Sequence, residues 1–264
     1  MLYGVPQIED IENSRKILMD KRGEEYVFPA EPVTPEEMAD VLRKKLSDVG
    51  IGWSVVLNNR IVSKISVSGR DRTIYVNSAL NYTAAEIQRL RVHEVEVHVY
   101  RGANGDRQPF RMFREGLGGY DEAEEGLAVM AEDVSGCLEI DTRQIKLYAA
   151  RCLAVSLAIE GSFYDVFEGL GEFFPEYLAY RLAERVKRGI RDTSSGGAFT
   201  KGAHYVSGYR KLREYIANGG NLSNLYVGKV GLADIPDVEI LIEEGVLERP
   251  KFMPGFTGLD DQVI

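Results

Sequence analysis

The sequence predicts an α+β fold, in which a mainly helical body carries a small antiparallel sheet. Thr34 and Thr83 are each followed three residues later by glutamate, and each such capping box indicates the start of a helix. Three short runs rich in β-branched residues lie between them, and from Asp121 onward the pattern is mostly helical. We therefore expect an N-terminal extension over residues 1–31 and a single domain over residues 32–264.

The first expected helices lie in the N-terminal part of the chain. A short helix is expected over Ile8–Met19. A clearer one begins at Thr34, with Pro35 at the first helical position and Glu37 completing the capping box. Because its apolar residues recur on one face, this helix should continue to about Leu46.

The β-branched runs are Trp53–Leu57, Ile61–Val67 and Thr73–Val76. The residues between them, Asn58-Asn59 and 69–71, are typical of hairpin turns. Apolar and polar residues alternate in the middle run, so one of its faces should be solvated. We expect three consecutive antiparallel strands.

The second half of the sequence has the spacing and the end signals of several helices. A proline bends one of them at Phe174-Pro175, and a pair of glycines after Asn218 ends another. The helices are expected over Asp121–Ser135, Thr142–Ile159, Phe163–Lys187, Lys201–Ala217 and Asp237–Glu244.

Composition excludes several classes of protein. The net charge of −9 argues against broad nucleic-acid binding, since phosphate backbones select basic surfaces. No apolar run is long enough to suggest a membrane span, and the first residues lack the pattern of a signal peptide. Cys137 and Cys152 are too few for a disulfide framework. We expect a cytoplasmic protein without nucleic-acid or membrane partners, and its oligomeric state is left open.

The segment Arg91–Arg101 contains His93, Glu94 and His98, and its conformation decides what these side chains can do. Its second half alternates polar and β-branched residues, which is typical of a strand. In a regular helix, residues five apart differ by about 140° around the axis. A π-turn makes residues i and i+5 neighbours. Because the capping box at Thr83 favours a helix and the segment is long for a strand, we predict a helix with a local π-turn.

These three side chains suggest a zinc hydrolase, which needs neutral imidazoles to hold the metal and a carboxylate to activate water. Glu124 and Glu125, at the start of a later helix, could supply an acidic third ligand. The alternatives are two surface or partly buried histidines in an acidic segment, and an ordinary acidic first helical turn that the helix dipole stabilises.

Three stretches in order resemble one known family. They read R-L-R-V-H-E-V-E-V-H-V-Y-R-G-A-N-G-D-R-Q-P-F, G-L-G-G-Y-D-E-A-E-E-G-L-A-V and G-G-A-F-T-K-G-A-H-Y-V-S-G-Y. In combination they are similar to the family of microtubule-associated tyrosine carboxypeptidases, MATCAP, whose bacterial members carry a Q-E-G-L-A motif. The resemblance runs from about Pro32 to Pro254.

The resemblance implies a zincin-like metallopeptidase site between helices, in a catalytic domain that spans residues 32–264. His93 and His98 would be zinc ligands, and Glu94 would be the general base. Glu125, the glutamate before Gly-Leu-Ala, would be the third ligand, with Glu124 as the alternative. Here the motif reads E-E-G-L-A, which leaves the ligand position intact.

The implied function is a zinc-dependent carboxypeptidase that removes a C-terminal residue, an aromatic one in the family, from a peptide or protein. Another zinc-dependent amide hydrolase and a non-catalytic metal-binding or regulatory protein are the alternatives. From the resemblance we expect a chain that lacks much of the helical N-terminal region of the longer members. We therefore expect a compact prokaryotic member whose substrate need not be tubulin.

Two groups of residues are candidates for contacts with the substrate. Lys201, His204 and Tyr205 share one face of an expected helix. Lys201 could bind a terminal carboxylate and His204 or Tyr205 could donate to the oxyanion, unless they only pack on the core. Arg107 and Arg114 lie in the loop between the two ligand helices, where bidentate arginine would suit the substrate's α-carboxylate. Otherwise they are ordinary surface arginines.

Overall fold

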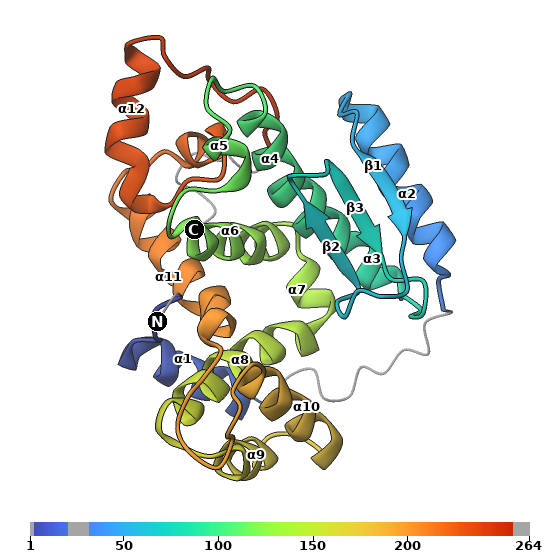
Figure 1. The fold of residues 1–264 in the computed structure, drawn as a ribbon, viewed down its shortest axis with the longest axis vertical. Coiled ribbons are helices and arrows are strands. Elements are labelled where there is room, and N and C mark those ends of the chain that lie inside the picture. Colours follow the sequence, from blue (N-terminus) through green and yellow to red (C-terminus); the bar gives the residue numbers. More distant parts are fainter. Residues whose placement is uncertain (1–2, 21–31, 256–264) are drawn as a thin grey trace. The chain divides into compact units, whose positions relative to one another are not determined.

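The computed structural model describes residues 3–20 and 32–255, drawn as a coloured ribbon in Figure 1. The described residues fall into two compact units. One contains residues 3–20 and 142–211, and the other contains residues 32–141 and 212–255. The α+β class is confirmed, because helices dominate and one small sheet is present. The division into an extension and a single catalytic domain stays a prediction, and residues 1–2 and 21–31 of that extension lie outside the described part.

The first unit is helical. Its helix α8 contacts both the N-terminal helix α1 and the helices that follow it, and small buried residues such as Ala149, Ala154 and Ala158 let these helices approach closely. Lys187 is buried and donates to the carbonyl groups of Ala158 and Ser195, which holds the loop after α10. The elements are α1 (Ile8–Met19), α8 (Thr142–Glu160), α9 (Phe163–Gly171), α10 (Glu176–Lys187), the 3₁₀ turn η2 (Thr200–Ala203) and the start of α11 (His204–Ala217).

The single bent helix expected over Phe163–Lys187 is wrong, because the chain forms two helices there. The helix α9 ends at Gly171, and α10 begins after Pro175, whose backbone is extended rather than helical (φ −58°, ψ 150°). Proline has no N–H to continue the hydrogen-bond ladder of the preceding turn. The break is therefore complete.

The second unit holds the sheet. Its strands are β1 (Ser54–Leu57), β2 (Ile65–Ser68) and β3 (Thr73–Val76), in the order β1-β3-β2. The pairing of β2 with β3 is antiparallel, as expected, but β1 runs parallel to β3. The predicted all-antiparallel sheet is therefore wrong.

The parallel pair has a visible physical cause. The most buried strand, β3, takes the centre of the sheet, and residues 58–64 form a crossing loop instead of a hairpin. The side chain of Asn77 donates to the carbonyl groups of Ile61 and Ser63, at 2.8 and 3.3 Å, and holds this loop. The N-terminal half of the predicted second strand is thus used as a connection.

The sheet is contacted by α2, which packs on β1 and β3, and by η1, which packs on β2. Both predicted capping boxes are present: the backbone N–H of Glu37 donates to Thr34 Oγ1, and that of Glu86 donates to Thr83 Oγ1, each at 3.2 Å. The elements are α2 (Pro35–Val49), α3 (Ala84–Leu90), the π-helix η1 (Arg91–Val99), α4 (Tyr100–Gly105), α5 (Met112–Glu115), α6 (Tyr120–Val134), α7 (Cys137–Ile140), the 3₁₀ turns η3 (Leu222–Val227) and η4 (Leu232–Asp234), and α12 (Ile235–Glu243).

The elements α3, η1 and α4 follow one another without an intervening loop, so the histidine segment is helical and not a strand. The predicted π-turn is confirmed and extends over the nine residues of η1. One side of η1 contacts α6, and η1 also contacts β2 and α2 (Figure 1). Among the helices of the described residues, none is both long and apolar enough to cross a bilayer.

Gly105 allows the short helix α5 to lie against the end of α4. A Cβ added at this position would overlap the carbonyl oxygen of Phe113, which is a backbone atom and cannot rotate away. We expect Gly105→Ala to lower the free energy of unfolding by about 1–3 kcal/mol, because such overpacking outweighs the roughly 1 kcal/mol by which alanine favours a helix. Gly118→Ala, in open space, is the control for chemical denaturation. Equal stability of the two variants would contradict this packing.

Cys137 and Cys152 are both free and buried, as the sequence indicated. Burial raises the pKa of both thiols, that of Cys152 to about 11. Since only the thiolate reacts, we expect iodoacetamide at mildly alkaline pH to leave both residues unmodified in the folded protein and to modify both in denaturant. Mass spectrometry after a timed quench measures this difference. Rapid labelling of the native protein would contradict the described burial.

Candidate metal centre

The π-helix places His93 and His98 side by side. Their ring centroids are 5.0 Å apart and the rings are inclined by 65°. Both imidazoles are largely buried, with about a tenth of each side chain exposed (9% and 12%). Glu94 joins them, since one ligand atom from each of the three side chains lies within 4.8 Å of the other two. The widened helical turn therefore creates the cluster that a regular helix would have separated.

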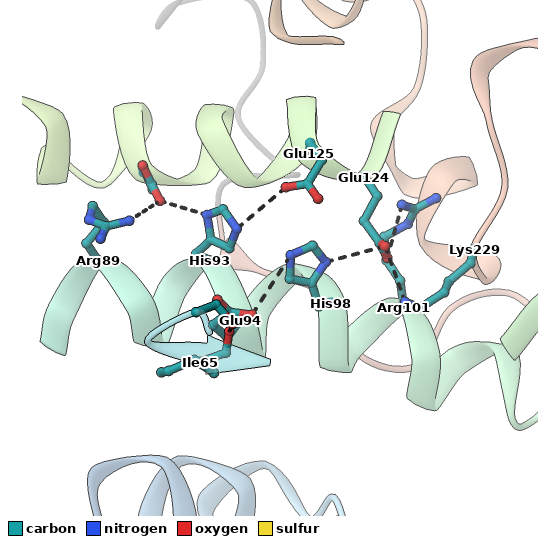
Figure 2. Close-up of polar contacts among 11 residues, drawn as sticks. Ile65, Arg89, His93, Glu94, His98, Arg101, Glu124, Glu125 and Lys229 are labelled. Atoms are coloured by element: carbon teal, nitrogen blue, oxygen red, sulfur yellow. Dashed lines mark hydrogen bonds and ion pairs between the residues drawn. The ribbon is translucent and has the colours of Figure 1, made fainter. Parts of the chain in front are cut away.

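The helix α6 supplies the facing side of the site. Figure 2 shows Glu124 and Glu125 pointing from α6 toward the helix that carries the two histidines. Glu125 Oε2 lies 3.8 Å from His93 Nε2, and Glu124 Oε2 lies 3.5 Å from His98 Nδ1. On the histidine helix itself, Glu94 Oε2 lies 3.9 Å from His98 Nε2. Each Nε2 atom therefore faces a carboxylate at a distance beyond that of a hydrogen bond.

A further carboxylate of α6, that of Glu132, binds His93 on the side of the ring opposite Nε2. Its Nδ1 donates to Glu132 Oε1 at 2.7 Å, and Arg89 Nη1 donates to the same oxygen at 3.1 Å. Glu132 has no exposed surface. Because a carboxylate only accepts, this contact fixes the proton of the ring on Nδ1 and directs Nε2 toward Glu125.

The surrounding carboxylates also change the acidity of His93. Burial alone would lower its pKa, but the hydrogen bond and charge of Glu132, with the charges of Glu94 and Glu125, raise the pKa to about 9. The ring is thus a proton-binding site in a negative field. A positive charge is favoured at this point of the structure.

Glu124 lies between two buried cations. Lys229 Nζ donates to its Oε2 at 3.2 Å, and Arg101 Nη1 lies 3.5 Å from its Oε1. Burial opposes its ionisation, yet Lys229, His98 and Arg101 together hold the pKa of Glu124 well below its usual range. Glu124 is therefore an ionised carboxylate that already has cationic partners.

Arg101 is itself fixed by the backbone. Its guanidinium is fully buried and donates to the carbonyl groups of Leu225, Gly228 and Val230. Guanidinium hydrogen bonds to three carbonyl groups leave this side chain little freedom to move. The end of η3 and the segment that follows it are thereby attached to the candidate metal centre.

The chain matches the family model described as MATCAP, microtubule-associated tyrosine carboxypeptidase, over residues 1–261. It belongs to the MATCAP family. Similar proteins include microtubule-associated tyrosine carboxypeptidase 1 of Mus musculus, which is 28% identical over 188 residues, 66% of this chain and 38% of the relative. The protein of the same name in Homo sapiens has the same identity and coverage. The putative tyrosine carboxypeptidase MATCAP2 of Homo sapiens is 24% identical over 234 residues, 87% of this chain and 44% of the relative.

The chain thus spans less than half the length of the curated relatives that it matches. The resemblance in the three motifs is confirmed as membership of the family. Two of these motifs meet in the second unit, because His93 and His98 lie on η1 and Glu125 lies on the helix that packs against it.

In this MATCAP-family chain, the two arginines proposed to bind substrate are both paired with acidic residues. Arg107 pairs with Glu248. Arg114 lies 3.1 Å from Asp106 and 3.3 Å from Glu115. Both arginines lie in the same unit as the candidate metal centre. Their role toward a substrate carboxylate stays a prediction.

Lys201, His204 and Tyr205 belong to the other unit, where a 3₁₀ turn precedes α11. His204 is buried, and its Nε2 donates to the carbonyl oxygen of Tyr3 at 2.8 Å. The ring of Tyr205 stacks on that of Tyr148, with centroids 4.6 Å apart. Their catalytic roles stay predictions.

Four residues that support the candidate metal centre were not predicted from the sequence. Two had a usable signal, because Arg89 lies one turn before His93 and Glu132 lies two turns after Glu125, each on a shared helix face. Arg101 follows His98 by three residues but could not be told from a surface arginine. Lys229 had no local signal. The four are Arg89, Arg101, Glu132 and Lys229.

Proposed function

We propose that this chain is a zinc-dependent carboxypeptidase that acts on the C-terminus of a peptide or protein. His93, His98 and Glu125 would hold the zinc ion, and Glu94 would be the general base. The observation that supports this most is the direction of the two Nε2 atoms, each of which faces a carboxylate 3.8–3.9 Å away. Two imidazoles and a carboxylate form a usual ligand set for catalytic zinc.

The residues present fit such an ion. Their side chains are largely buried, and His93 presents the nitrogen opposite the one that donates to Glu132. A histidine that binds metal through one ring nitrogen commonly donates through the other to a carboxylate. The negative field that raises the pKa of His93 favours a cation at the same place.

Glu125 is a better candidate than Glu124 for the third ligand. Glu124 is paired with Lys229 and faces Arg101, and it lies beside the Nδ1 atom of His98. Glu125 lies beside the Nε2 atom of His93. A ligand must lie where the metal-binding nitrogens point, so the position of Glu125 suits that role.

The chemistry follows from these positions. Zinc, when bound, supplies a Lewis acid that lowers the pKa of water and polarises the carbonyl group of the scissile bond. Glu94 would take the proton of the attacking water and deliver it to the leaving amine. Its carboxylate is buried next to both histidines, within reach of a water in that cluster. Glu132 and Glu124 would keep the rings in place during this exchange.

The names of the relatives support the substrate class. They are called tyrosine carboxypeptidases, which points to a C-terminal aromatic residue as the group released. A carboxypeptidase also needs a cation for the terminal carboxylate. Arg107, Arg114 and Lys201 are the proposed residues for that contact, with His204 or Tyr205 as donors to the oxyanion.

Metal binding gives the first test. We expect the wild-type protein, purified without chelators, to contain about one zinc ion per chain, as a three-ligand catalytic site requires. His98→Ala should lose it. His204→Ala is the matched control, because it removes the third histidine of the chain and should leave the zinc content unchanged. Elemental analysis measures the content. A wild-type protein that takes up no zinc on reconstitution would rule out the proposed function.

The role of Glu94 gives the second test. Glu94→Gln should keep the zinc and lower the rate of tyrosine release from a peptide ending in tyrosine by about 100- to 10,000-fold, the usual contribution of a general base. Glu139→Gln, an exposed change of the same charge, should behave as wild type. Chromatography of the released amino acid measures the rate. Undiminished release by the zinc-loaded Glu94→Gln variant would exclude Glu94 as the base.

A further inference from the structure

We propose that Glu132 and Glu124 are positioning residues, which hold the rings of His93 and His98 through their Nδ1 atoms. Arg89, Arg101 and Lys229 hold these two carboxylates in turn. This inference rests on the proposed zinc site, and it assigns a role to five residues outside the ligand set. It also separates the adjacent Glu124 and Glu125, giving Glu125 to the metal and Glu124 to the support of a ligand.

The hydrogen bond between His93 and Glu132 is short, and Glu132 is fully buried. Its Nδ1 lies 2.7 Å from Glu132 Oε1, and no part of Glu132 is exposed. Arg89, which is 6% exposed, donates to the same oxygen and fixes it. A hydrogen bond on Nδ1 sets the tautomer in which Nε2 is free of its proton and can bind a metal.

The contact between His98 and Glu124 is longer than that between His93 and Glu132, but Glu124 has more partners elsewhere in the chain. Its Nδ1 lies 3.5 Å from Glu124 Oε2, an ion-pair distance, and Lys229 donates to the same oxygen. Lys229 is held by its own backbone, whose N–H donates to Phe113 and whose carbonyl oxygen accepts from Leu117. With Arg101 bonded to three carbonyl groups, Glu124 lies between two fixed cations. The carboxylate of Glu124 is therefore fixed beside Nδ1 of His98 and limits the rotation of that ring.

Stability alone does not account for these groups. Removing a carboxylate and a cation from water costs several kcal/mol per ion, and buried ion pairs are often replaceable by apolar residues without loss of stability. Two such arrangements lie against the two histidines, each at the ring nitrogen opposite the one that faces Glu125 or Glu94. Carboxylates in this position orient both histidines and increase the basicity of their Nε2 atoms, which explains why these charges are buried here.

Zinc affinity tests the proposal. Competition with a chromophoric chelator should show that Glu132→Gln and Glu124→Gln each bind zinc about 10- to 100-fold more weakly than wild type, the usual effect of losing an outer partner of a ligand. The effect should be larger for Glu132, whose contact is shorter. Glu125→Gln, which removes a ligand, should exceed about 100-fold. Glu139→Gln is the exposed control and should match wild type.

The outcomes separate the two proposals. A wild-type chain without zinc affinity overturns the proposed function and this inference with it. Zinc affinity that Glu125→Gln destroys, but that Glu132→Gln and Glu124→Gln leave intact, overturns only the positioning role. Loss at Glu124→Gln as complete as that of a ligand, with affinity kept in Glu125→Gln, overturns the assignment of the two neighbours.

A second variant separates positioning from folding. Glu132→Asp keeps the charge that balances Arg89 but withdraws the carboxylate by one methylene from His93. Thermal unfolding of the metal-free protein reports on the fold, and zinc affinity is compared among variants that melt like wild type. A folded Glu132→Asp protein should still bind zinc more weakly. Wild-type affinity in that protein would show that only the ion pair with Arg89 matters and would overturn the proposal.

Discussion

The widened turn of η1 is the constraint on which the rest of the site depends. In a regular helix His93 and His98 would point in directions about 140° apart, whereas here their rings are neighbours. A π-helix gives up ideal backbone geometry, and such segments are found mostly at functional sites. The cost is met by burial, because His93, Glu94 and four valines of η1 lie against α6, α2 and the sheet. Packing on several sides fixes a conformation that the segment would not adopt alone.

The same packing encloses an excess of negative charge. The buried carboxylates are Glu94, Glu124, Glu125 and Glu132, and the buried cations are Arg89, Arg101 and Lys229. The surrounding carboxylates raise the pKa of His93 to about 9, so a second proton on its ring offsets this excess of one charge. A bound divalent cation would displace that proton, since metal ligands must be deprotonated. The same excess of negative charge therefore accounts for the raised pKa of His93 and favours the proposed zinc ion.

The sequence predicted what is local. Capping boxes depend on residues three apart, and the π-turn follows from asking how two histidines five apart could share a metal. The parallel pairing of β1 with β3 was not predicted, because residues 61–64 have the pattern of a strand but form part of a loop that Asn77 binds. The proposed roles of Lys201, His204 and Tyr205 rest on a helical face alone. Spacing along one helix carries no information about the other unit of the chain.

The two neighbouring glutamates show why the site itself was only partly predictable. Successive residues of an α-helix differ by about 100° in direction, so Glu124 and Glu125 cannot face the same nitrogen. Which of the two is the candidate ligand depends on which one is already paired with cations. Lys229 lies 105 residues after Glu124, and its segment is held near α6 by the bonds of Arg101 to Leu225 and Gly228 and by its own backbone bonds to Phe113 and Leu117. In the pattern E-E-G-L-A, the sequence does not distinguish the two glutamates as ligands. The structure distinguishes them, because Lys229 and Arg101, which are distant in the sequence or on another helix, pair with Glu124.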